Sequence, residues 1–333
     1  MLTPAQRYAK EAATRYFLRP PIAATAAIGG VAGSISPTAK NIIGLGIGAK
    51  VTAGTIISGQ DVVRVYVRVK MPLSQLAAAH IVPAQFESLP TDVIEVGDIT
   101  ASQSLQTWQR FGRHRPLSCG VSVGHPNVTA GTLGCLVEKN GTRYILSNNH
   151  VLADSNGAQA NDRIIQPGAA DGGASPSDDI ATLEPYKAID FSGQPNDIDA
   201  AIAEVGPATQ QTVEPEIIDV GRPGRTPKTA KLYQSVRKHG RTTGHTVGVI
   251  MDLSASLWVG YRVGNANQSA WFEDQIAIQG VGAAPFSQPG DSGSLIVDAV
   301  DLEPVALLFA GGGTLTFANP IKAVLTYYGV NVV

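Results

Sequence analysis

The sequence has few charged residues and almost no net charge. Asp, Glu, Lys and Arg make up 16% of its 333 residues, and the formal net charge is −2. An ordinary globular protein has about 25% charged residues. A near-neutral chain has no electrostatic basis for binding nucleic acid or an anionic membrane surface. We therefore expect neither as a partner.

Cysteine is scarce, and long apolar runs are absent. Cys119 and Cys135 are the two cysteines. They could lie on neighbouring strands, and we expect free buried thiols, with a disulfide as the alternative. The weakly apolar run 22–35 is too short to span a bilayer and starts late for the apolar core of a signal peptide. These features predict a cytoplasmic protein that does not enter the membrane.

Patterns for metal ions and cofactors are also missing. His239 and His245 flank a Gly-Arg-Thr-Thr-Gly turn, and no further ligand pattern accompanies them. The glycine run 44–48 is followed by another apolar strand, whereas a dinucleotide site needs a helix at that point. We expect no metal and no cofactor.

Glycine and proline are abundant, with 36 and 21 residues. From Cys119 onward, short alternating apolar runs are separated by Gly, Pro, Asn and Asp. Many short strands joined by turns are typical of an all-β barrel protein.

The most informative motif is Gly290-Asp291-Ser292-Gly293, directly before an apolar strand. A serine hydroxyl becomes a nucleophile when a base takes its proton and donors stabilise the oxyanion that forms. Glycine allows the tight turn that directs backbone N–H groups at that charge. The same residue types also form ordinary turns. The interpretation therefore depends on a base and an acid elsewhere in the chain.

His150 is the favoured base because it follows the short apolar strand 143–147. His125 precedes a Pro-Asn turn and is interpreted as a structural histidine. No histidine follows Ser292, and position 294 is serine. Both facts exclude the Gly-x-Ser-x-Gly elbow of α/β-hydrolases, whose triad order is Ser, Asp, His.

Asp199 is the favoured acid, with Asp179 and Asp197 as alternatives. Asp199 opens the compact apolar strand 200–205, which can bury a carboxylate beside an imidazole. Asp179 opens another apolar run, and Asp197 lies two residues before Asp199.

The order His150, Asp199, Ser292, with gaps of 49 and 93 residues, resembles the chymotrypsin-like serine proteases. Their triad has the same order, with separations of about 45 and 93. The chain is most similar to the intracellular, trypsin-like peptidases of bacteria and plants that include the plant protein NARROW LEAF 1. The segments 129–134, 147–152 and 240–244 carry this likeness, which extends from about residue 118 to 325.

This resemblance implies a mainly β fold, with two antiparallel six-stranded barrels preceded by a small α+β domain. It implies a serine endopeptidase that acts on protein or peptide substrates through an acyl-enzyme. The backbone N–H groups of Gly290 and Ser292 would form the oxyanion hole. A protease fold kept only for binding or assembly is the alternative function.

The resemblance also suggests a specificity pocket. Its floor would be Phe286, six residues before the serine, and its wall would be Phe309, Ala310 and Gly311. Because the floor carries no acid, we expect small or apolar side chains before the cut and poor cleavage after Lys or Arg.

The expected organisation has five parts. They are an N-terminal helix and leader (1–40), a small α+β domain (41–100), a linker (101–117), a first barrel with the histidine and aspartate (118–212), and a second barrel with the serine (213–333). Within the α+β domain we expect strands near 42–51, 62–69 and 92–96 and a helix near 73–80. The domain lacks a catalytic constellation. Homo-oligomerisation through this domain is one expectation, and its attachment to the barrels suggests the hypothesis that it regulates the site. In the alternative function it would recruit partners or mediate assembly.

Overall fold

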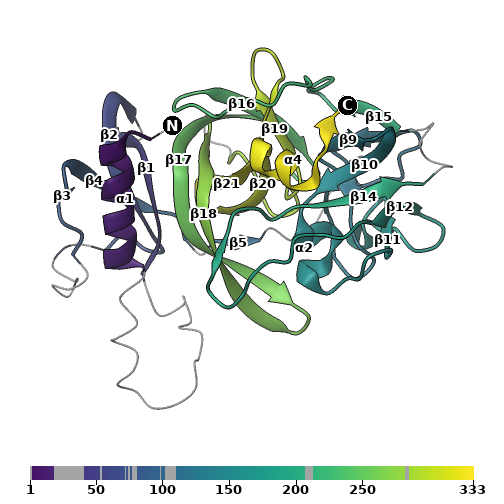
Figure 1. Ribbon diagram of the computed structural model, residues 1–333, viewed down its shortest axis with the longest axis horizontal. Helices are drawn as coiled ribbons and strands as arrows, with labels where there is room; N and C mark the ends of the chain where they lie inside the picture. Colours follow the sequence, from purple (N-terminus) through teal and green to yellow (C-terminus); the bar gives the residue numbers. More distant parts are fainter. Residues whose placement is uncertain are drawn as a thin grey trace.

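The computed structural model describes residues 2–18, 41–52, 55–71, 73, 76, 81–97, 99–101, 110–206, 213–281 and 285–333. The fold is mainly β. Two strand bodies lie side by side, and the N-terminal helix and strands lie at the far side of the second body (Figure 1).

The second body is a closed six-stranded barrel. Its strands are β16 (Ser235–Gly240), β17 (Gly244–Val263), β18 (Ala266–Gly280), β19 (Leu295–Asp298), β20 (Pro304–Gly312) and β21 (Leu315–Pro320). Antiparallel pairing runs round the ring in the order β16-β17-β18-β21-β20-β19 and returns to β16. Alternating side chains, among them Val236, Ile250, Ile278 and Ile296, form an apolar cluster.

The first body also closes. Its strands are β6 (Leu117–Cys119), β7 (Ser122–Val123), β8 (Gly131–Thr132), β9 (Cys135–Lys139), β10 (Thr142–Ser147), β11 (Arg163–Ile165), β12 (Asp179–Leu183) and β14 (Ala201–Val205). β6 and β7 form one interrupted strand, and β8 and β9 form another. Pairing follows β7-β8, β9-β10-β14-β12-β11, and a bridge from Gly124 to Ile165 completes the ring. The predicted mainly β, two-barrel fold is confirmed.

Strand pairing crosses the boundary expected at residue 212. β15 (Val213–Ile217) pairs with β6, and β22 (Asn331–Val332) pairs with β9. The chain therefore returns to the first barrel after it completes the second. The remaining short elements are α2 (Asn149–Leu152), the 3₁₀ turns Asp154–Asn156 and Ala169–Asp171, β13 (Pro195–Asn196) and α4 (Ile321–Tyr328).

The N-terminal residues continue the sheet of the second barrel. They form α1 (Pro4–Phe17), β1 (Ile42–Thr52), β2 (Thr55–Val67), β3 (Gln85–Phe86), β4 (Leu89–Glu95) and β5 (Thr100–Ala101). β1 pairs with β2 on one side and with β17 on the other. The expected α+β domain therefore does not have a sheet of its own, because the 20-residue β17 offers an edge to β1.

Close approach explains the glycines of the 44–48 run. A Cβ on Gly46 would lie 1.6 Å from Oδ2 of Asp252, and one on Gly48 would lie 2.2 Å from the carbonyl oxygen of Met251. Glycine is required because β1 packs directly on β17.

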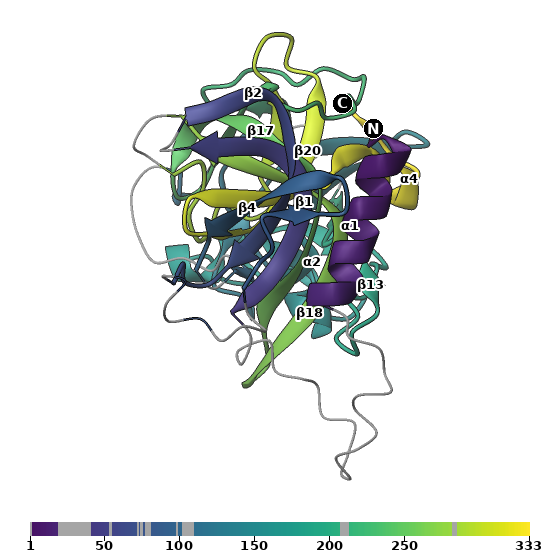
Figure 2. The same cartoon turned by 90° about the vertical axis from the view of Figure 1, so that its left-hand side faces the viewer.

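The helix α1 lies across β1 and β2 (Figure 2). Its Ala9 and Ala13 pack in a cluster with Leu45, Val65 and Trp271. The helix expected near 73–80 falls largely outside the described residues. Within the described part of the chain, no helix is both long and apolar enough to cross a membrane.

Candidate active site

The candidate base lies where the first barrel leads into a helical turn. His150 is in α2, directly after β10, and its side chain is 1% exposed. Its Nδ1 lies 2.5 Å from Oδ2 of Asp199. Nε2 is buried and has no hydrogen-bond partner within the described structure. Nε2 is thus the ring nitrogen left to accept a proton.

The candidate acid, Asp199, is fully buried, and hydrogen bonds fix both its side chain and its backbone. Asp199 accepts hydrogen bonds from the backbone N–H of His150 (3.2 Å) and the hydroxyl of Tyr261 (3.0 Å). Its own N–H donates to Asn319, and its carbonyl accepts from the amide of Asn148. Burial, followed by the nearby carboxylate, raises the pKa of Tyr261 well above its usual value, so the phenol remains a donor.

The two alternative acids have other partners. Asp179 lies 3.9 Å from Arg163 on the surface of the first barrel. Asp197 is 61% exposed and forms an ion pair with Lys187. Of the three candidate carboxylates, Asp199 is the one that the fold brings to His150.

His125 has the contacts of a structural residue. Its Nε2 lies 3.3 Å from the carboxylate of Asp162, and its Nδ1 accepts the N–H of Asn127. The histidine therefore stabilises the turn that its sequence neighbours predict.

Ser292 lies in the turn before β19, and its side chain is fully buried. Its Oγ donates to the carbonyl oxygen of Phe309 at 3.2 Å. Thr132 of the first barrel fixes the turn, because its N–H donates to Ser292 and its hydroxyl donates to the carbonyl of Gly290. No described residue accepts a hydrogen bond from the N–H of Gly290. That N–H is available to a ligand.

Gly293 cannot be replaced without moving the turn. Its φ is +94°, and an added Cβ would lie 2.0 Å from Oγ of Ser147. Both the backbone conformation and the contact with the first barrel therefore require glycine.

Asp291 anchors the same turn from the second barrel. Its carboxylate accepts the N–H groups of Thr242 (2.8 Å), Thr243 (3.1 Å) and Gln288 (2.9 Å). Nζ of Lys238 lies 3.5 Å from it, and both side chains are fully buried. Burial lowers the pKa of Lys238, while the neighbouring carboxylate opposes that shift.

Ser294, the departure from the usual Gly-Asp-Ser-Gly-Gly, takes part in the turn. Its hydroxyl donates to the carbonyl of Asp291 at 2.6 Å. The serine side chain therefore adds a hydrogen bond at a position where glycine would offer none.

Sequence reasoning missed Thr132, Lys238, Tyr261 and Asn319. Thr132 lies within the family-like segment 129–134, and Lys238 lies two residues before the segment 240–244, which was a usable signal. Tyr261 and Asn319 come from β17 and β21 of the second barrel, and nothing in their neighbouring residues points to the site.

The proposed pocket residues lie close to the turn. Phe286 is 1% exposed, and its ring packs in the apolar cluster of the second barrel beneath Lys238. Phe309 is buried against Phe272, with ring centroids 4.8 Å apart. Ala310 and Gly311 pair with β5. The assignment of these residues to a specificity pocket stays a prediction.

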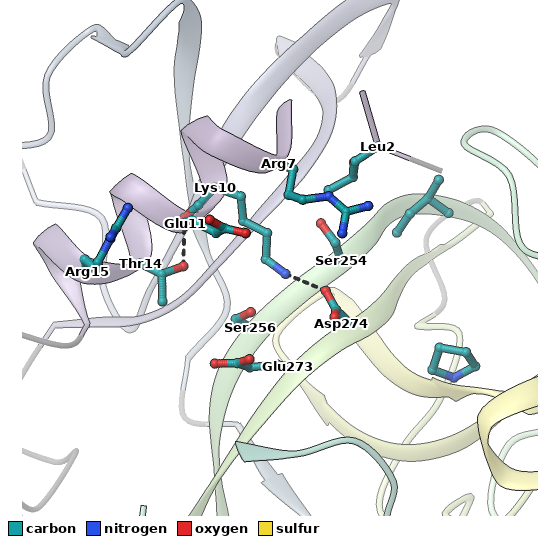
Figure 3. Close-up of a pocket in the computed structure, with 12 residues that line it drawn as sticks. Leu2, Arg7, Lys10, Glu11, Thr14, Arg15, Ser254, Ser256, Glu273 and Asp274 are labelled. Carbon is teal, nitrogen blue, oxygen red and sulfur yellow. Dashed lines mark hydrogen bonds and ion pairs between the residues drawn. The ribbon is translucent and has the colours of Figure 1, made fainter. Parts of the chain in front are cut away.

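Other candidate sites have little support. Cys119 and Cys135 are free and buried, and burial raises the pKa of Cys119 to about 12. Among the described residues, no three His, Cys, Asp or Glu side chains gather closely enough to hold a metal ion. A hollow of about 540 Å³ lies between α1 and the β17–β18 ribbon (Figure 3). None of its lining residues belongs to the candidate triad.

No family model matches the sequence, and neither does any curated protein. Solved structures do. One is a glutamic acid-specific serine protease, at 18% identity and a TM-score of 0.46 over 65% of this chain and 100% of the other. Thermobifida fusca protease A matches at 17% identity and a TM-score of 0.44, and Cellulomonas bogoriensis chymotrypsin at 16% identity and a TM-score of 0.44. Each match covers 65% of this chain and 99% of the other. At these values they carry no argument about what this chain cleaves.

The architecture itself defines the fold. Two closed antiparallel barrels carry the His and Asp on one side and the Ser on the other. This is the chymotrypsin-like serine protease fold. The narrower likeness to the group that includes NARROW LEAF 1 stays a prediction.

Proposed function

We propose that this protein is a serine endopeptidase whose triad is Ser292, His150 and Asp199. The observation that carries the proposal is the 2.5 Å contact between Nδ1 of His150 and the buried carboxylate of Asp199. A buried carboxylate in this position fixes the imidazole tautomer and stabilises the imidazolium that forms during catalysis.

In the structure the hydroxyl of Ser292 donates to the carbonyl of Phe309, and Nε2 of His150 has no partner among the described residues. In the acylation step this hydroxyl turns to Nε2 of His150. Oγ then forms a bond to the scissile carbonyl carbon, and its proton passes to Nε2. The N–H groups of Gly290 and Ser292 stabilise the resulting oxyanion. The C–N bond then breaks, and the imidazolium gives its proton to the leaving amine. Asp199 stays ionised throughout.

In the deacylation step, a water molecule gives a proton to His150 and its oxygen attacks the ester carbon. The Oγ–C bond breaks, and Ser292 regains its proton. The turn remains in place through both steps because Asp291 and Thr132 hold its backbone.

The proposal is tested with a biotinylated fluorophosphonate, which phosphonylates activated serines. We expect labelling of the wild-type protein and none of Ser292→Ala or His150→Ala. Ser192→Ala is the matched control, because this exposed loop serine bonds only to Asp190 among the described side chains. A protein that folds normally and remains unlabelled at every concentration, also after mutations that displace the residues enclosing Ser292, would instead be a protease fold used for binding.

We also propose that small or apolar residues precede the cut. No acidic side chain occupies position 286, and Phe286 contributes an apolar ring. Digestion of a peptide library, read by mass spectrometry, tests this. Cuts predominantly after Lys or Arg would contradict the proposed specificity and leave the triad untouched.

A further inference from the structure

The candidate site is closed in this structure. The side chains of Ser292 and His150 are 0% and 1% exposed. A peptide can be attacked only after something that encloses these residues moves. We propose that the segment Ile99–Ala101 is an intramolecular inhibitor, which occupies the strand edge on which a substrate would lie. This inference rests on the proposed endopeptidase function.

The relevant edge belongs to β20. On one side β20 pairs with β21 along most of its length. On the other side β19 pairs only with residues 304–307. The edge of β20 beyond Phe309 is therefore left open by the barrel, next to the carbonyl that accepts Ser292 Oγ. Open strand edges bind extended peptides through backbone hydrogen bonds.

The chain's own β5 occupies this edge. Ala101 pairs with Ala310, and Thr100 pairs with Gly311, in antiparallel register. From Thr100 to Ala101 the chain therefore advances along β20 toward Phe309 and the nucleophile. An extended substrate needs the same backbone groups, so the two cannot bind together.

Apolar contacts fix the segment in place. Ile99 is 4% exposed and packs in the cluster that contains Tyr261 and Phe309. Its carbonyl accepts the N–H of Gly260 at 3.0 Å. Tyr261 also donates to Asp199, and Phe309 accepts from Ser292. The segment thus packs on the residues that support the triad.

The N-terminal strands hold the segment from the other end. Val96 continues β4, its N–H donates to Val67, and it is fully buried. A Cβ on Gly313 would lie 3.0 Å from the backbone of Val96, so the approach there is close. The N-terminal residues are in turn anchored to the barrel.

Two polar contacts reinforce this anchor. The hydroxyl of Tyr66 donates to the buried carboxylate of Asp252 at 2.6 Å, which links β2 to β17. Nζ of Lys10 lies 2.8 Å from Asp274, which links α1 to β18 (Figure 3). Release of the segment therefore requires either local detachment of β5 or displacement of the whole N-terminal sheet.

The test variant is Thr100→Pro. Thr100 has strand partners on both sides, Gly260 and Gly311, and proline removes an N–H and is not accepted between two strands. Gln85→Pro is the matched control, because β3 is also two residues long and pairs only with β4. We expect kcat/KM for a tripeptide thiobenzyl ester to rise at least tenfold in Thr100→Pro and to stay unchanged in Gln85→Pro.

A second variant and a second readout keep the test decisive if proline prevents folding. Ile99→Ala removes the buried anchor, and Ile94→Ala removes a partly buried side chain that packs on the same cluster from β4. We expect several-fold activation only in Ile99→Ala. Hydrogen exchange of a fragment covering 308–313 should accelerate in the activated variants, because the β20 edge loses its partner.

The outcomes separate the two proposals. If the wild type, Thr100→Pro and Ile99→Ala hydrolyse the ester equally fast, the inhibitor proposal is refuted. If Ser292→Ala abolishes this hydrolysis, the endopeptidase proposal still holds. Faster exchange at β20 with no hydrolysis and no fluorophosphonate labelling would refute both.

Discussion

Two fully buried aspartates, Asp199 and Asp291, belong to the candidate site and have different partners. Asp199 accepts a hydrogen bond from the phenol of Tyr261 and contacts the imidazole of His150. Asp291 accepts three backbone N–H groups and lies 3.5 Å from Nζ of Lys238. One carboxylate therefore faces an imidazole, whose charge changes in the proposed mechanism, and the other faces the ammonium group of a buried lysine.

This difference follows from what each carboxylate has to do. A fixed cation beside Asp199 would weaken its stabilisation of the imidazolium, and among the described residues it has none. Asp291 only has to hold a turn. A buried charge with that role is stable when a cation and several N–H donors surround it.

The largest effect is expected on the Asp199 side. Asp199→Asn keeps the shape of the side chain and loses the charge that orients the tautomer of His150. We expect kcat to fall by about 10⁴-fold with little change in the unfolding midpoint. Steady-state hydrolysis of the peptide ester and thermal unfolding measure the two quantities.

Asp197→Asn is the control, because that carboxylate is 61% exposed and pairs with Lys187. Activity near the wild-type level in Asp199→Asn, or a comparable loss in Asp197→Asn, would show that the acid has been assigned wrongly.

On the Asp291 side the same kind of change should act on stability. Lys238→Met leaves the buried carboxylate of Asp291 without its cation. We expect unfolding to become easier by about 3–5 kcal/mol. The activity that remains should fall as well, because the turn that carries Ser292 loosens. Urea unfolding measures the first effect and kcat/KM the second.

Lys228→Met offers the contrast. Lys228 pairs with Asp301 and Asp298 nearer the surface of the same barrel. The urea midpoint should stay unchanged, because solvent already screens that pair. Similar midpoints for the two methionine variants would mean that the buried pair is not what holds the turn.

The sequence predicted the parts of this comparison that depend on local pattern. The Gly-Asp-Ser-Gly turn, the strand before His150 and the apolar strand after Asp199 are each contained in fewer than ten residues, so their alternation and turn chemistry were visible. The order of these segments along the chain then indicated the candidate triad. The choice of Asp199 over Asp179 and Asp197 stayed open until the fold placed one of them at His150.

The rest depends on contacts between distant segments. Tyr261 reaches Asp199 across 62 positions, and Asn319 reaches it across 120. The attachment of β1 to β17 joins residues more than 200 positions apart. No local periodicity encodes such pairings. The N-terminal residues were therefore predicted as a separate domain, although they extend the sheet of the second barrel.

The surroundings of Asp291 also contain a histidine that makes the stability of the protein depend on pH. His239 follows Lys238 on the Asp291 side and is 1% exposed, and burial lowers its pKa to about 4. The unfolded chain has a histidine pKa of about 6.5. Between these values the unfolded state binds a proton that the folded state does not, so stability falls as pH drops through this window. His239 therefore does not reduce the unfolding free energy above pH ~6.5. At pH ~4.5 the proton that only the unfolded state binds has lowered the unfolding free energy by about 2–3 kcal/mol.

His239→Gln should therefore flatten the dependence of the unfolding free energy on pH between 7 and 4.5. His245→Gln, at the exposed position directly opposite in the β16–β17 pairing, should leave it intact. Urea titrations at a series of pH values measure both. An unchanged slope in His239→Gln would assign the acid sensitivity to other groups.

The smallest effect is expected where a neutral donor supports Asp199. Tyr261→Phe removes one hydrogen bond to a carboxylate that keeps the N–H and the ring of His150 as partners. With one donor fewer, the carboxylate attracts the imidazolium more strongly. The acid limb of the kcat/KM profile should therefore move to higher pH, by less than about one unit.

Above that limb, kcat should fall less than about tenfold, the scale of one hydrogen bond. Tyr233→Phe is the control, because no hydrogen bond joins this hydroxyl to Asp199 or His150 among the described residues, and its removal should shift neither the limb nor kcat. A drop in kcat with an unmoved acid limb would make Tyr261 a packing residue. A shifted acid limb would instead show that Tyr261 influences the charge interaction between Asp199 and His150, for which Asp291 has no counterpart.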